Sequence, residues 1–184
     1  MLRYFVLVGS PPLPMIPMLG FYSLGLFQSI GLSTLIAGLG SVGLSIAGSL
    51  GAILGTILVK KLGIRKTYLM SLTGCLITMI GFFISGLFEG DHVKWIGLVF
   101  ITLCMGVGNM GVMTVPFALP AIWVPIKYRT ICMAVLVITG LCVIFVWTIL
   151  FPFLLIQIGN WTFLIFLVCL GLNLVHAWVY VKLE

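Results

Sequence analysis

Residues 35–66 read LIAGLGSVGLSIAGSLGAILGTILVKKLGIRK, which joins a long uncharged run to a short basic loop. The uncharged run, 35–59, exceeds the roughly 20 residues that a helix needs to cross the hydrocarbon core of a membrane. The loop that follows holds four of the nine Lys and Arg residues of the whole chain. This pattern predicts a transmembrane helix that ends at a membrane surface.

The composition of the whole chain agrees with this interpretation. Of 184 residues, 62% are hydrophobic and only 7% are charged, and the mean hydropathy is +1.37. So few charges could not cover a water-exposed surface of ordinary size. The apolar runs are continuous and do not alternate with polar residues, so we expect membrane helices and not a membrane barrel.

Six apolar runs predict six transmembrane helices, at about residues 4–30, 35–59, 67–88, 95–124, 130–158 and 161–181. The connections between the runs are only a few residues long. We therefore expect residues 1–184 to form a single all-α membrane domain without a soluble domain.

The basic residues predict how this domain is oriented. If both termini lie in the cytoplasm, only Lys94 is outside, and eight basic residues are inside: Arg3, Lys60, Lys61, Arg65, Lys66, Lys127, Arg129 and Lys182. Such a bias is typical of cytoplasmic loops. The basic loop at 60–66 would also lie well against the anionic lipid headgroups of the inner leaflet.

Prolines are expected to break the first and fourth helices. The first run contains a cluster that ends at Pro17, and the fourth contains Pro116 and Pro120. Irregular backbone at membrane depth is tolerated where protein or a water-filled cavity satisfies it. Because the first and fourth of six helices would begin two groups of three, matched breaks there favour a transporter with its binding site at the breaks.

Several other classes of protein are disfavoured. The five cysteines all fall inside the expected helices and form no CxxC pair, so we expect neither a disulfide framework nor a metal site. No paired acids or nucleophile with a base converge, so we expect no enzyme, no catalytic residue and no cofactor. The net charge of +6 follows from the topology, and nucleic acid binding is not expected.

Several stretches carry a family resemblance: FYSLGLFQSIGLS (21–33), LVKKLGIRKTYLM (58–70), VPFALPAIWVPIKYR (115–129), NWTFLIF (160–166) and VKLE (181–184). In order and spacing they resemble the carboxy-terminal half of a sugar porter of the major facilitator superfamily, similar to the facilitative hexose transporters. The resemblance implies a six-helix half built as a three-plus-three repeat. It also implies a location in the plasma membrane and a second six-helix half as partner.

The resemblance implies candidate residues for the solute cavity, although many polar positions of the family are replaced. The amides that would contact a sugar fall on Pro11, Pro12 and Pro17, and an asparagine, a tryptophan and a further polar residue fall on Gly140, Leu141 and Gly48. A stacking tryptophan falls on Phe117, which keeps an aromatic face. The remaining candidates, each of which could equally serve in packing, are Tyr22, Gln28, Asn109, Thr114 and Trp147.

The cytoplasmic gate is altered in the same way. The resemblance carries Lys61, Gly63, Arg65 and Arg129 over from the family's two inner loops. The acidic positions that pair with the arginines there fall on Lys60 and Ile122. Like charges repel, so the inner gate would have to close by other means.

Two hypotheses for the function remain open. In the first, the chain is half of a facilitative carrier for a small neutral solute, with a hexose-type sugar as the first candidate. A uniporter is favoured because no Asp or Glu falls within an expected helix and could relay protons. In the second, the chain is a truncated or degenerate, transport-inactive membrane protein that associates with a full-length transporter.

Overall fold

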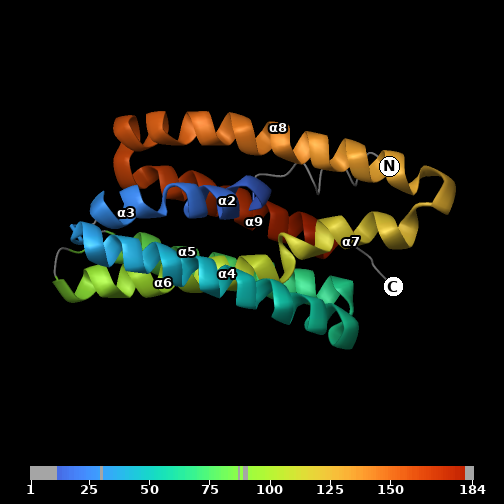
Figure 1. Ribbon diagram of the computed structural model, residues 1–184, viewed down its shortest axis with the longest axis horizontal. Helices are drawn as coiled ribbons and strands as arrows, with labels where there is room; N and C mark the ends of the chain where they lie inside the picture. Colours follow the sequence, from blue (N-terminus) through green and yellow to red (C-terminus); the bar gives the residue numbers. More distant parts are fainter. Residues whose placement is uncertain (1–11, 30, 87, 89–90, 181–184) are drawn as a thin grey trace.

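The computed structural model describes residues 12–29, 31–86, 88 and 91–180, and every element in this part is helical (Figure 1). In the labels of Figure 1, the elements are α2 (Pro12–Phe21), α3 (Ser23–Ser29), α4 (Thr34–Leu62), α5 (Ile64–Ser85), α6 (Asp91–Gly111), α7 (Thr114–Trp123), α8 (Ile126–Ile158), the 3₁₀ turn η1 (Gly159–Trp161) and α9 (Thr162–Tyr180). Residues 4–11 of the first expected helix, including Pro11, lie outside the described residues, as do Arg3 and Lys182.

Helix length and apolarity make this an integral, multi-pass membrane protein. Within the described residues, four helical segments are long and apolar enough to cross a membrane: Thr34–Leu62, Ile64–Ser85, His92–Ala118 and Ile126–Ile158. A shorter apolar helix covers Thr162–Val175. The first expected helix is instead divided into α2 and α3, with 10 and 7 residues. The number of six spans therefore stays a prediction.

The first and fourth expected helices are each divided into two elements, but not at the prolines. The first division lies at Tyr22, between α2 and α3, and the second at residues 112–113, between α6 and α7. Pro17 lies inside α2, whereas Pro116 is the third residue of α7. A proline in the first turn costs no helix hydrogen bond, because the N–H that it lacks would be unpaired there anyway. Pro116 is therefore compatible with the start of a helix, and Pro120 also falls within α7.

A single glycine reverses the chain between α4 and α5. Gly63 has φ +83°, a conformation that side chains other than glycine rarely adopt, and its N–H donates to the Val59 carbonyl at 3.1 Å. Lys60 and Lys61 lie in the last turn of α4, where the negative end of the helix dipole favours cations. The basic loop is thus a tight turn between two membrane helices.

Small residues allow the helix backbones to lie close together. A Cβ atom at Gly51 would collide with the main-chain carbonyl of Gly106, and one at Gly55 would collide with that of Met110. On the other side of α6, a Cβ at Gly111 would lie 2.6 Å from the Ser71 Cβ of α5. Helix α6 is therefore in close contact with both α4 and α5.

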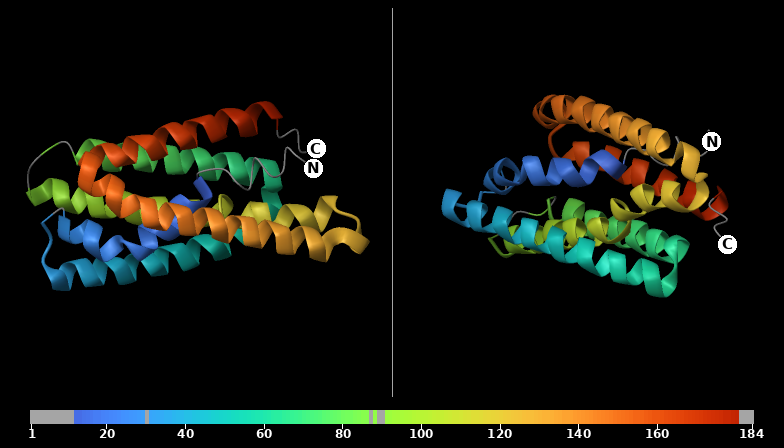
Figure 2. Two further views of the ribbon diagram at one scale, coloured as in Figure 1. Left: turned by 90° about the horizontal axis from the view of Figure 1, so that it is seen from above. Right: turned by 45° about the vertical axis from the view of Figure 1, so that its right-hand side comes forward.

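Helix α2 lies in the interior of the bundle and α8 along one side of it (Figures 1 and 2). Met15, Ile16, Met18 and Leu19 of α2 are each at most 2% exposed. In the most apolar window of α8, in contrast, only 11% of residues are buried, against 44% in α5. Seen from above, α4 and α9 lie on opposite sides of the bundle (Figure 2, left).

Candidate functional site

Tyr22 occupies the interruption between α2 and α3, and its hydroxyl is already engaged. The phenolic O–H donates to the Thr148 main-chain carbonyl of α8 at 2.8 Å. The ring packs against Phe151, with 5.3 Å between ring centroids. The side chain is half-buried, so Tyr22 serves here as a link between α2–α3 and α8.

Trp147 belongs to the same aromatic cluster as Tyr22. Its ring lies 5.2 Å from that of Phe166 in α9, and Phe166 in turn lies 6.0 Å from Phe151. Phe163 extends the cluster, because it contacts Phe151 at 6.2 Å and Phe82 of α5 at 4.9 Å. The structure thus brings two of the predicted cavity residues onto one aromatic cluster shared by α8, α9 and α5.

Asn109 and Thr114 lie on the two sides of the α6–α7 interruption. The Asn109 side-chain amide donates to the Met105 carbonyl at 2.9 Å, and the Thr114 hydroxyl donates to the Asn109 carbonyl at 2.6 Å. A Cβ at Gly48 of α4 would lie 3.2 Å from the Asn109 amide nitrogen. The amide therefore lies against α4, at the glycine where the family resemblance expects a polar residue.

Gln28 and Phe117 lie away from the Tyr22 interruption along the chain. Gln28 is exposed in the last turn of α3, and Phe117 is half-buried in α7, beyond the interruption that follows Asn109. Another polar contact joins α3 to α4, where the Ser23 hydroxyl donates to the Ser41 hydroxyl at 2.9 Å.

The free backbone groups of the α6–α7 interruption are satisfied from within this bundle. The hydroxyl of Ser71 in α5 donates to the Val107 carbonyl at 2.6 Å and accepts from the Val112 N–H at 3.1 Å. Sequence reasoning missed Ser71, because one serine in an apolar run carries no recognisable signal. It also missed Thr148, although Pro152 inside the fifth expected helix marks a carbonyl without its helix donor.

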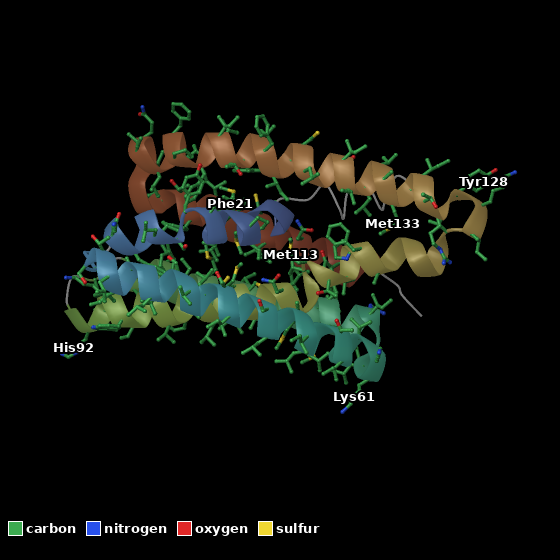
Figure 3. The ribbon with its side chains drawn as sticks, in the orientation of Figure 1. Phe21, Lys61, His92, Met113, Tyr128 and Met133 are labelled. Atoms are coloured by element: carbon green, nitrogen blue, oxygen red, sulfur yellow. The ribbon has the colours of Figure 1, made fainter. Side chains whose placement is uncertain are left out.

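The predicted gate residues gather at one end of the bundle. Lys60, Lys61, Gly63 and Arg65 form the α4–α5 turn, and Arg129 lies in the first turns of α8. Figure 3 shows Lys61 and Tyr128 at this end and His92 at the opposite end. Among the residues described at this end, none is acidic.

Arg129 carries a buried nitrogen without a partner. Its Nε is shielded from solvent and has no hydrogen-bond acceptor in the described structure. The neighbouring Lys127 has its Nζ 5.7 Å from the centroid of the Tyr128 ring. The basic side chains at this end thus carry positive charge with no acidic side chain among the described residues there.

Comparison with known proteins connects this architecture to a family. No curated protein matches the chain. The sequence profile of the family described as "Sugar (and other) transporter" matches residues 5–183, which is nearly the whole chain. The long apolar helices described above agree with a transmembrane protein of this kind. The chain therefore belongs to the sugar transporter family of the major facilitator superfamily.

Proposed function

We propose that this chain forms one six-helix half of a facilitative transporter for a small neutral solute, with a hexose as the first candidate. The observation that carries the proposal is the family match over residues 5–183. The family supports transport of sugars or related solutes, and the finer points below rest on the geometry.

The pattern of helix packing supports a three-plus-three arrangement. We number the helices in chain order, counting α2–α3 as the first, α6–α7 as the fourth and α9 as the sixth. We exchange the first helix with the fourth, the second with the fifth and the third with the sixth. Under this exchange, the contact between α2 and α8 corresponds to that between α6 and α4, and the contact between α3 and α4 corresponds to that between α7 and α8. The contact between α5 and α6 likewise corresponds to that between α9 and α2, and the contact between α4 and α5 to that between α8 and α9. The contact between α5 and α9 corresponds to itself. Two similar three-helix groups related by a pseudo-twofold axis would pack in this way.

The distribution of charge supports uniport with both termini in the cytoplasm. The chain has three acidic residues, Glu89, Asp91 and Glu184, and Asp91 is the first residue of α6. Intramembrane carboxylates are the usual proton relays of coupled transporters, and this half offers none within an expected helix. Of the basic residues that the structure describes, Lys94 lies near the His92 end, and the others lie near the Lys61 end (Figure 3).

The exposed helices support a requirement for a second six-helix half. Transporters of this architecture hold the solute near the midplane, between two repeats that move against each other. Helix α8 has most of its apolar surface uncovered, and α4 presents exposed residues such as Leu39, Ile46 and Ile53. Another copy, a relative or further residues of the same gene product would each supply the second wall.

Glucose uptake into lipid vesicles tests the proposal. We expect saturable uptake of D-glucose, with L-glucose excluded, when crosslinking shows that a second half is present, and none from a proven monomer. Imposing a pH gradient should leave uptake unchanged. Trp147→Ala should lower uptake, whereas Trp178→Ala, at a residue that is 70% exposed, should not. Accumulation driven by a pH gradient would contradict uniport, and uptake by a monomer would contradict the need for a second half.

Two features, at the predicted gate residue Arg129 and at Tyr22, favour a second candidate function, that of a transport-inactive partner. The Arg129 Nε has no acceptor among the described residues, and the Tyr22 hydroxyl donates to a main-chain carbonyl. Both features fit a transport-inactive chain that associates with a full-length transporter. Absence of saturable uptake in every assembly, together with co-purification of a full-length relative, would support this candidate over the first.

A further inference from the structure

Pro152 leaves one main-chain carbonyl of α8 without its helix hydrogen bond. It lies inside this 33-residue helix and has no N–H to donate to the carbonyl four residues earlier, which belongs to Thr148. Lipid offers no water to replace the missing donor, and an unsatisfied carbonyl in an apolar environment is costly. A membrane helix with an internal proline therefore needs a donor from a neighbouring element.

Tyr22 supplies that donor. Its hydroxyl donates to the Thr148 carbonyl at 2.8 Å, across 126 positions of sequence. The Thr148 side chain does not compete, because its own hydroxyl donates to the Ile144 carbonyl at 2.7 Å. The acceptor that Pro152 leaves free is thus the one that the phenol uses.

The link joins the residue that divides α2 from α3 to the turn of α8 before Pro152. Tyr22 is itself the residue at which α2 gives way to α3, and its ring contacts Phe151, the residue directly before Pro152. Regular helix is stiff, whereas a proline is where a helix bends. Tyr22 therefore connects the division between α2 and α3 to the proline-containing turn of α8.

We propose that Tyr22 and Pro152 form a positioning pair, in which the Tyr22 hydroxyl caps the carbonyl freed by Pro152 and makes the α2–α3 junction and the carboxy-terminal part of α8 move together. The pair's role in a transport cycle rests on the proposed function. Its existence does not, because it follows from the hydrogen bonding of α8.

A double-substitution cycle tests whether the two residues depend on each other. Four versions of the full chain are unfolded by heat in lipid nanodiscs: the wild type, Tyr22→Phe, Pro152→Ala and the double variant. With Pro152 present, Tyr22→Phe keeps the ring, leaves the Thr148 carbonyl without a donor and should lower Tm by about 3–8 °C. With alanine at 152 the helix has its own N–H, and the same change should lower Tm by less than about 1 °C. Tyr128→Phe, at an exposed tyrosine, is the matched control and should have no effect in either background.

Spin labels distinguish positioning from stability alone. Leu24 in α3 and Ile156 in α8 are exposed and accept labels in a cysteine-free version of the chain. Tyr22→Phe should broaden the distribution of distances between the labels, and the double variant should stay broad although its Tm has recovered. Equal losses of Tm in both backgrounds, or an unchanged distance distribution in Tyr22→Phe, would overturn the proposal. Neither measurement needs transport, so a failure of glucose uptake and a failure of this pair are told apart.

Discussion

Ser71 offers the sharpest test of how the α6–α7 interruption is stabilised. In a continuous helix the Val112 N–H would donate to the Gly108 carbonyl, but the Met113 N–H takes that carbonyl at 3.2 Å. The Val112 N–H donates instead to the Ser71 hydroxyl, which in turn donates to the Val107 carbonyl. Ser71 is 2% exposed and Val112 is 1% exposed, so water cannot replace the serine.

The expected cost of Ser71→Ala follows from these two bonds. A buried N–H without an acceptor costs about 1–3 kcal/mol, and the lost bond to the Val107 carbonyl adds about 0.5–1.5 kcal/mol. Alanine keeps the Cβ that contacts Gly111, so no cavity term is added. We expect the free energy of unfolding to fall by about 1.5–4.5 kcal/mol, which lowers the Tm of a chain of this size by at least about 3 °C.

Two measurements check this expectation, thermal unfolding in nanodiscs and amide hydrogen exchange of the peptide that contains Val112. Exchange should become faster there and stay unchanged in α4. Ser49→Ala is the matched control, because this exposed hydroxyl donates to the Ser45 carbonyl of its own helix at 3.0 Å. Its effect should remain within about 0.5 kcal/mol. If Ser71→Ala were as mild as the control and left the exchange at Val112 unchanged, the interruption could not depend on this hydroxyl.

Three further predictions concern packing and topology. Gly51→Ala should destabilise the chain by about 2 kcal/mol or more in thermal unfolding, because its Cβ would meet a main-chain carbonyl of α6. The control Gly43→Ala has open space around its Cβ and should be neutral or slightly stabilising. In a cysteine-free version of the chain, Lys61→Cys should not react with an impermeant thiol reagent in intact cells, whereas His92→Cys should react. Labelling at position 61 would show that the predicted orientation is wrong. Asn160 matches a glycosylation sequon but lies in the three-residue turn between α8 and α9, so we expect it to stay unmodified. A mobility shift that glycosidase removes, and that Asn160→Gln abolishes, would contradict this expectation.

The sequence predicts the long helices well because their solvent is lipid. The runs at 35–59 and 67–88 became α4 and α5, with ends within three residues of the prediction. The second run also carries small residues that allow close contact between helices, since Gly51 and Gly55 lie against main-chain carbonyls of α6. Burial of apolar side chains and internal hydrogen bonding are both required in a bilayer, and both can be read from the order of residues alone.

The positions of the interruptions were harder to predict. Proline content suggested Pro17, Pro116 and Pro120, but a helix can contain a proline when the carbonyl that it leaves free finds another donor, or when the proline lies in the first turn. The actual interruptions, at Tyr22 and at Val112, carry no such signal. At Val112 a side chain from another helix, Ser71, satisfies the backbone N–H. At Tyr22 the main chain keeps its own helix-type bonds, and the side chain donates to a carbonyl of α8.

From the amino-acid sequence come the membrane environment, the helical class, the basic turn at Gly63 and the family. The partners of the irregular backbone groups come only from the folded arrangement. Tyr22 and Thr148 are 126 positions apart, and Ser71 and Val112 are 41 apart. Hydrogen bonds are short and directional, so whether such distant residues meet depends on the packing of whole helices and not on local pattern. Only the packing of the helices shows that the hydroxyl of Tyr22, a predicted cavity residue, donates to the carbonyl that Pro152 leaves free.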